Sequence, residues 1–162
     1  MDDLKKFALV EKAASFSPDM AKINAQALVE LKAEDVFAFR IRAADDQVDR
    51  DFERFTADAL DGLAKLFVGK TVIADHMWSS SMQTARIYDA AVEKMSGTTV
   101  LVLFAYMLRN DQTAATIAAV EGGIPREVSV GCAMGKATCS ICGADTRPTA
   151  WENTQGNKFT AN

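Results

Sequence analysis

Two residues of this chain have the types and the spacing that serine hydrolase chemistry requires. Ser129 stands in the stretch 127–131, and His76 is the only histidine among 162 residues. A serine hydroxyl at neutral pH is a weak nucleophile and needs a base within hydrogen-bonding distance. An imidazole base must therefore be His76, and only the fold can bring it to Ser129. The alternative interpretation is a serine on the wet face of a strand and an ordinary surface histidine.

The three cysteines indicate a different chemistry. Cys139 and Cys142 form a CxxC pair followed by Gly143, which supplies half of a tetrahedral zinc site, and Cys132 is a candidate third ligand. The residues after Cys142 include no further cysteine or histidine, and one histidine rules out zinc sites built on two. We therefore expect no cofactor. The cysteine spacing allows a zinc site on Cys139 and Cys142. The alternative interpretation is a pair of exposed thiols that bind no metal.

The composition is that of an ordinary globular domain. Hydrophobic residues make up 49% and charged residues 25% of the chain, which allows a sizeable core. The formal net charge of -4 argues against nucleic acid as a partner, because phosphate binding requires a basic face. The sequence has no run of about 18 apolar residues and no secretory signal pattern in residues 1–16. We expect no membrane partner and reduced thiols.

Apolar residues at helical spacing predict three helices. The first opens at Ser17-Pro18 and continues to Leu31; the second is capped by Thr56 and stopped by Gly69; the third starts at Asn110 or Asp111 and ends at Gly122-Gly123.

Five stretches alternate or are continuously apolar, which predicts strands. They cover residues 37–42, 70–75, 84–95, 98–108 and 124–132. A turn at Ser96-Gly97 joins the third and fourth, and the fourth is apolar on both faces, as in a central strand. On the last strand Val128 and Val130 share one face, while Glu127, Ser129 and Gly131 share the other.

These elements predict an α+β fold: a mostly antiparallel, β-barrel-like sheet of five or six strands with about three packed helices. Residues 1–135 form one domain, and residues 136–162 form a polar C-terminal tail that carries the CxxC pair.

The order of several motifs resembles that of the phage prohead protease family. The matching segments are DRDFERF, LFVGK, TVIADH, QTARIYDA and GIPREVSVG, which lie between Asp49 and Gly131. That family carries its base after a strand in a D-H or similar motif, and its nucleophilic serine in an S-x-G motif some fifty residues later. His76 and Ser129 occupy these two positions.

The resemblance implies a fold similar to herpesvirus assemblin and a serine endopeptidase that matures capsids. Its substrate would be phage capsid or scaffold protein, and often the enzyme itself. It would act in the cytoplasm of the bacterial host, within the assembling prohead, and relatives of this type can depend on dimerisation. Ser129 would attack the scissile carbonyl, and His76 would move the proton to the leaving amine.

The third catalytic member stays open. Glu127 shares the strand face of Ser129, and Glu121 and Asp89 are the other candidates. Many relatives place an acidic residue on a later strand, in a segment resembling E-x-S-x-V-x-x-P-A that this sequence does not contain. This departure leaves two alternatives to an active protease. One is a truncated or inactive protease-like capsid-assembly factor, and the other is a zinc-knuckle binding module.

Overall fold

The computed structural model describes residues 8–11, 17–75, 77, 79–125, 127–132 and 136–146, with the backbone alone described for 8–11. The chain divides into two compact units, Met1–Val130 and Gly131–Asn162. The first unit holds the sheet and the helices, and the second holds a short hairpin that is described with the site.

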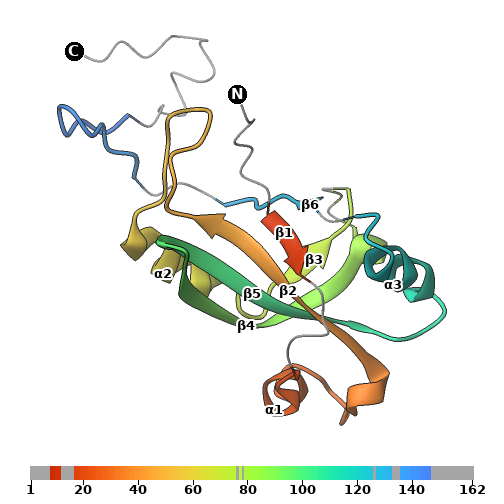
Figure 1. Ribbon diagram of the computed structural model, residues 1–162. Coiled ribbons are helices and arrows are strands. Elements are labelled where there is room, and N and C mark those ends of the chain that lie inside the picture. Colours follow the sequence, from red (N-terminus) through yellow and green to blue (C-terminus); the bar gives the residue numbers. More distant parts are fainter. Residues whose placement is uncertain are drawn as a thin grey trace. The chain divides into compact units, whose positions relative to one another are not determined.

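The first unit is an α+β structure with one six-stranded sheet (Figure 1). All neighbouring strands are antiparallel, and their order is β3-β4-β5-β2-β1-β6. The strands are β1 (Ala8–Glu11), β2 (Val36–Asp45), β3 (Thr71–Ile73), β4 (Gln83–Met95), β5 (Thr98–Leu108) and β6 (Glu127–Val128). The helices are α1 (Met20–Asn24), α2 (Ala57–Phe67) and α3 (Ala114–Glu121), with single 3-10 turns η2 (Ala33–Asp35) and η3 (Ser80–Met82). The predicted fold class is confirmed.

Strand β5 is a central strand of the sheet, as predicted, and it forms with β4 the expected hairpin. Its two turn residues, Ser96 and Gly97, both have left-handed backbones with φ of 49° and 86°, the geometry of a two-residue turn that matches strand twist. A bulge in β4 between Ile87 and Asp89 leaves Tyr88 as the extra residue opposite Phe104. Tyr88 faces the opposite side of the strand from Ile87, and the two side chains belong to different clusters.

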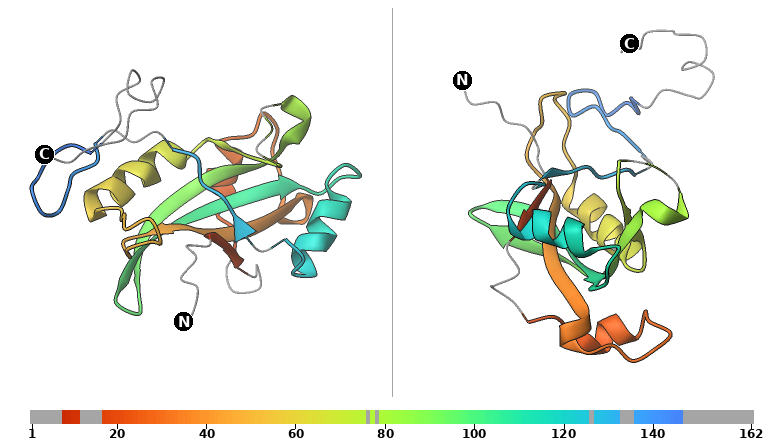
Figure 2. Two further views of the ribbon diagram at one scale, coloured as in Figure 1. Left: turned by 90° about the horizontal axis from the view of Figure 1, so that it is seen from above. Right: turned by 90° about the vertical axis from the view of Figure 1, so that its right-hand side faces the viewer.

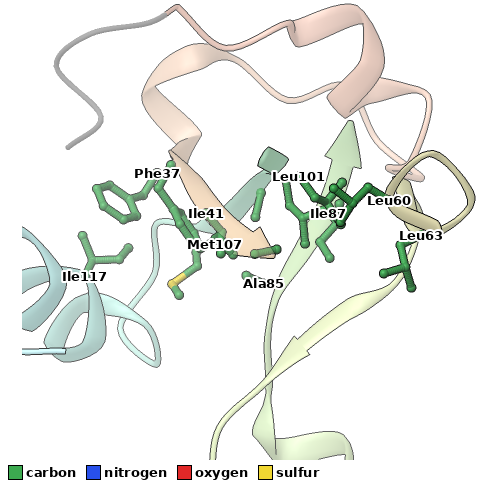
Figure 3. Packing of buried hydrophobic residues seen from close by; sticks show 13 residues of the cluster. Phe37, Ile41, Leu60, Leu63, Ala85, Ile87, Leu101, Met107 and Ile117 are labelled. Carbon is green, nitrogen blue, oxygen red and sulfur yellow. The ribbon is translucent and has the colours of Figure 1, made fainter. Parts of the chain in front are cut away.

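The sheet buries apolar side chains on both faces. The larger cluster lies under α2 and α3 and includes Leu60, Leu63 and Ile117 from these helices (Figure 3). The smaller cluster joins Ile23 of α1 to Tyr88 and Tyr106. Figures 1 and 2 show α1 apart from α2 and α3 accordingly. Strand β5 contributes to both clusters, which explains why its sequence is apolar throughout.

The two strands at the ends of the order reach the same interior. Val72 of β3 and Val128 of β6 both pack against the larger cluster, and so does Val130 just beyond β6. Both edges of the sheet therefore contribute side chains to the same cluster. Among the described strands no pairing joins β3 to β6, so these strands do not form a closed ring.

Two predicted helices are shorter than their sequence patterns indicated, because polar side chains compete for the backbone. Helix α1 starts after Asp19, not Ser17, and ends at Asn24, whose side chain accepts from the Leu31 amide at 2.8 Å and donates to the Leu31 carbonyl at 3.1 Å. Helix α3 starts only at Ala114, because Asn110 Oδ1 accepts from the amides of Gln112 and Thr113 at 3.0 and 3.1 Å. Helix α2 begins after Thr56 as predicted.

The edge of the sheet also differs from the prediction. Strand β1 was not expected, because it has only four residues and lies within a charged stretch. The last strand, predicted over residues 124–132, is confined to Glu127–Val128. Pro125, two residues earlier, has no amide hydrogen to donate, which limits pairing on that side. None of the described helices has the length and apolar character needed to cross a membrane.

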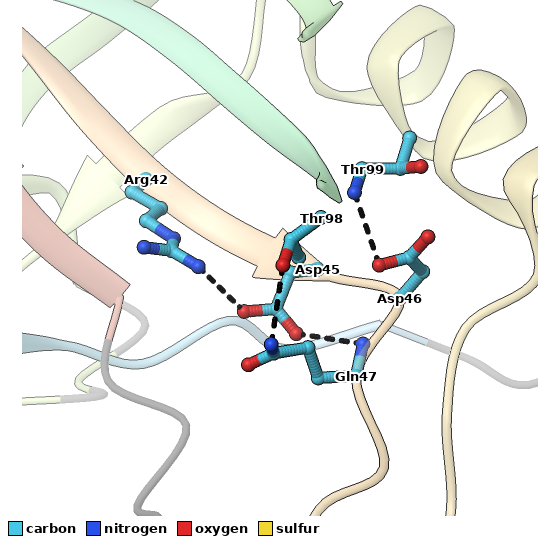
Figure 4. Close-up of polar contacts among 6 residues, drawn as sticks. All are labelled: Arg42, Asp45, Asp46, Gln47, Thr98 and Thr99. Atoms are coloured by element: carbon cyan, nitrogen blue, oxygen red, sulfur yellow. Dashed lines mark hydrogen bonds and ion pairs between the residues drawn. The ribbon is translucent and has the colours of Figure 1, made fainter. Parts of the chain in front are cut away.

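Polar contacts join the end of β2 to the start of β5 (Figure 4). The buried Asp45 carboxylate accepts from Arg42 and from the Gln47 amide, each at 3.0 Å. The Asp46 carboxylate accepts from the Thr99 amide at 3.0 Å. Hydrogen bonds from the Thr99 hydroxyl and amide hold the pKa of Asp46 below its usual range.

Truncating Leu60 is expected to destabilise the first unit. Leu60 is fully buried, so Leu60→Ala should lower the free energy of unfolding by about 2–5 kcal/mol through lost burial and a residual cavity. Leu66→Ala on the exposed face of the same helix is the matched control and should change it by about 0.5 kcal/mol or less. Urea unfolding followed by circular dichroism measures both, and equal losses would contradict the assigned helix faces.

The Asp46 contact predicts a pH dependence of stability. Because folding lowers the pKa of this carboxyl, its contribution is present above the unfolded pKa of about 3.9 and is lost as pH falls through the folded value. Asp46→Asn should therefore destabilise the protein at neutral pH, and the difference from the parent should shrink at acidic pH. Thr99→Val removes the hydroxyl that donates to Asp46. It should also destabilise the protein more at neutral than at acidic pH, but by less than Asp46→Asn. A parent-variant difference that stays constant with pH would refute this assignment.

Candidate functional site

Ser129 lies immediately after β6 and is exposed. Its neighbours on either side, Val128 and Val130, are partly buried and pack against the larger cluster. Glu127 and Gly131 are exposed like Ser129. The predicted alternation of faces is therefore confirmed, although Ser129 is not within a strand. Two anchored valines hold the backbone on both sides of the hydroxyl and leave the hydroxyl at the surface.

His76, together with Trp78, lies outside the described residues, so its distance to Ser129 is not part of the structure. The flanking backbone is described on both sides. The Ala74 amide donates to the Met82 carbonyl at 2.9 Å, and the Met77 amide donates to the Ala74 carbonyl at 3.0 Å. Asp75 has a φ of 54°, a left-handed conformation that is uncommon outside glycine. The backbone next to position 76 is thus fixed by hydrogen bonds at the end of β3.

The three acidic candidates for a third catalytic member have different surroundings. Asp89 forms a 2.6 Å ion pair with Lys22 of α1, and this hydrogen bond raises the pKa of Lys22. Because α1 packs through the smaller cluster, Asp89 lies on the opposite sheet face from the valines beside Ser129. The structure therefore does not bring Asp89 together with Ser129.

Glu121 and Glu127 are both exposed. Glu121, at the end of α3, lies 3.7 Å from Arg109, whose own Nε donates to the Val36 carbonyl at 3.1 Å. Glu127 is two residues from Ser129 on the same exposed side, and no ion pair joins it to another described residue. Of the three candidates, Glu127 is the one that the backbone places beside Ser129.

The described part of the second unit is a tight hairpin around the CxxC pair. The sequence predicted a tail without pattern, but Thr138 and Asp145 form an antiparallel bridge. The Cys139 amide donates to the Ala144 carbonyl at 2.8 Å, and the Gly143 amide donates to the Cys139 carbonyl at 2.9 Å. Gly143 has a φ of 75°, which explains why glycine follows the second cysteine. The Cys-x-x-Cys-Gly spacing was the signal that could have predicted this turn.

The hairpin directs hydrogen-bond donors at one sulfur. The amides of Cys142 and Ile141 and the Cys142 thiol donate to Cys139, and they lower the pKa of this thiol. Cys139 is partly buried, whereas Cys142 is exposed. Amide donors stabilise a thiolate, the form that binds metals and attacks electrophiles. Cys132 is also exposed, and the described residues include no group of three side chains able to hold a metal ion.

No protein family model, no curated protein and no solved structure matches the chain.

Proposed function

We propose that this chain is a serine endopeptidase of the capsid-maturation type, with Ser129 as nucleophile and His76 as general base. The observation that carries the proposal is the exposed Ser129 hydroxyl between two valines that pack into the core. A nucleophile must be accessible to a peptide and yet held by a rigid backbone. Ser129 meets both requirements, as a serine in a loose loop would not.

The position of β3 supports His76 as the base. Val72 packs against the same cluster as Val128 and Val130, so the strand before His76 and the segment around Ser129 border one interior. The backbone on both sides of position 76 is tied to Ala74 and Met82. The left-handed Asp75 next to it adds support, because uncommon backbone conformations concentrate at functional sites.

The proposed reaction is two-step peptide hydrolysis. Ser129 Oγ attacks the scissile carbonyl carbon while His76 takes the hydroxyl proton. His76 then gives this proton to the leaving amine as the C–N bond breaks, which leaves an acyl ester on Ser129. A water molecule, deprotonated by His76, cleaves the ester and restores both side chains. Amides of the segment just after Ser129 or of the loop before β4 are the candidate donors to the oxyanion.

The substrate and setting follow from the resemblance of the motifs between Asp49 and Gly131 to prohead proteases. The substrate is phage capsid or scaffold protein, and the enzyme also cleaves itself. It acts in the cytoplasm of the bacterial host within the assembling prohead, as a monomer or a homo-oligomer. The net charge of -4 fits a protein substrate better than nucleic acid.

A cleavage assay tests the proposal. The full chain is incubated with its cognate capsid or scaffold protein, and products are followed by mass spectrometry. Ser129→Ala and His76→Ala should each reduce cleavage by on the order of 10⁴-fold, because each removes a member of the catalytic unit. Ser17→Ala, which changes an exposed serine before α1, should cleave like the parent. Equal cleavage by all three variants would disprove the proposal, and no cleavage by the parent would favour a capsid-assembly factor without catalysis.

Covalent labelling tests the nucleophile without knowledge of the substrate. A fluorophosphonate probe reacts with serines activated by a base, so it should label the parent at Ser129 and not label Ser129→Ala. His76→Ala should lower the labelling rate, whereas Ser17→Ala should leave it unchanged. Peptide mapping by mass spectrometry identifies the modified residue. Labelling spread over several exposed serines would indicate that Ser129 is not activated.

A further inference from the structure

The CxxC hairpin has features that peptide hydrolysis does not use. It belongs to the second unit of the chain, Gly131–Asn162, and neither thiol has a role in the proposed Ser129 chemistry. Three backbone hydrogen bonds nevertheless define its backbone: the amides of Cys139 and Thr146 donate to Ala144 and Ala137 and so form the Thr138–Asp145 bridge, and the Gly143 amide donates to the Cys139 carbonyl. These bonds hold the short loop between the two cysteines in one conformation.

The hairpin carries an exposed Cys142 and a partly buried Cys139. They flank a two-residue turn that is closed by the hydrogen bond from the Gly143 amide to the Cys139 carbonyl at 2.9 Å. Two cysteines separated by two residues on such a turn are a typical pair of zinc ligands. Ile141 between them is 95% exposed, and Cys142 is exposed as well. A bulky exposed apolar side chain beside the two cysteines is suited to contact with another protein surface.

Among the described residues, too few ligands lie together to complete a metal site at this hairpin. Structural zinc takes four ligands in a tetrahedral arrangement, and thiolate is one of the ligands that zinc prefers. Cys132 does not join Cys139 and Cys142, since no group of three suitable side chains exists among the described residues. Apart from the three cysteines, the sequence contains one imidazole, that of His76.

We propose that Cys139 and Cys142 from two copies of this chain together bind one zinc ion, so that the hairpin is a metal-dependent dimerisation element. Two identical CxxC pairs related by a two-fold axis supply the four thiolates of a tetrahedral site, with the same surface used by both partners. The two Ile141 side chains flank the metal and become covered when the tips meet. Each thiol that still carries a proton releases it to solvent as zinc binds.

Metal titration of the full chain tests this proposal. The protein is reduced with a phosphine, stripped of metal with a chelator, and supplied with zinc chloride alone. Light scattering after size exclusion gives the molar mass, and atomic emission gives the bound zinc. The expected result is one zinc ion per two chains and a doubled mass, both reversed by chelator. Cobalt(II) in place of zinc should give the intense visible bands of a tetrahedral tetrathiolate site.

Matched cysteine variants identify the ligands. Cys142→Ser should abolish zinc-dependent doubling, whereas Cys132→Ser, which changes the remaining cysteine, should leave it intact. Because Cys142→Ser could alter the hairpin itself, the cobalt spectrum of the unmodified chain is an independent readout. One zinc ion per chain without a change in mass, a dimer that resists chelator, an intrachain disulfide that forms in preference to metal binding, or no zinc binding would each overturn the proposal. None of these measurements depends on protease activity.

Discussion

Burial of the larger hydrophobic cluster is the constraint on which the first unit depends. Strands β2, β4 and β5 turn alternate side chains to it, helices α2 and α3 cover it, and the edge strands β3 and β6 each add a valine. The same burial fixes the backbone around Ser129, because Val128 and Val130 are held there. Packing of the cluster therefore also fixes the position of the candidate nucleophile. Substitutions in the cluster should shift the surface segment that contains Ser129.

The sequence predicted the elements whose signals are local and strong. The long hairpin of β4 and β5 was readable from two apolar stretches around Ser96-Gly97, and α2 from the Thr56 cap and the spacing of Leu60 and Leu63. Elements decided by distant partners were harder. Strand β1 exists because β2 and β6 pair with it, and nothing within its four residues marks it. The early end of α1 depends on one side chain, Asn24, bonding to Leu31.

The candidate site was predictable to a similar degree. The alternation around Ser129 followed from the sequence, because two valines separated by one polar residue indicate a half-buried extended segment. The choice among acidic partners did not follow, since it depends on which face of the sheet each residue occupies. The bulge at Tyr88 and the docking of α1 turn Asp89 towards Lys22. The ordered CxxC hairpin also escaped prediction, because its contacts are backbone hydrogen bonds that composition does not reveal.

The pairing of β6 with β1 has a consequence for how the chain acquires its structure. These two strands come from opposite ends of the first unit and share only two paired positions, whereas β4 and β5 are joined by a two-residue turn. Closing a long loop costs more chain entropy than closing a short one. The central hairpin should therefore form early in folding, and the edge that carries Ser129 should assemble last. The backbone around Ser129 is therefore fixed only once the larger cluster has formed, because Val128 and Val130 pack against it.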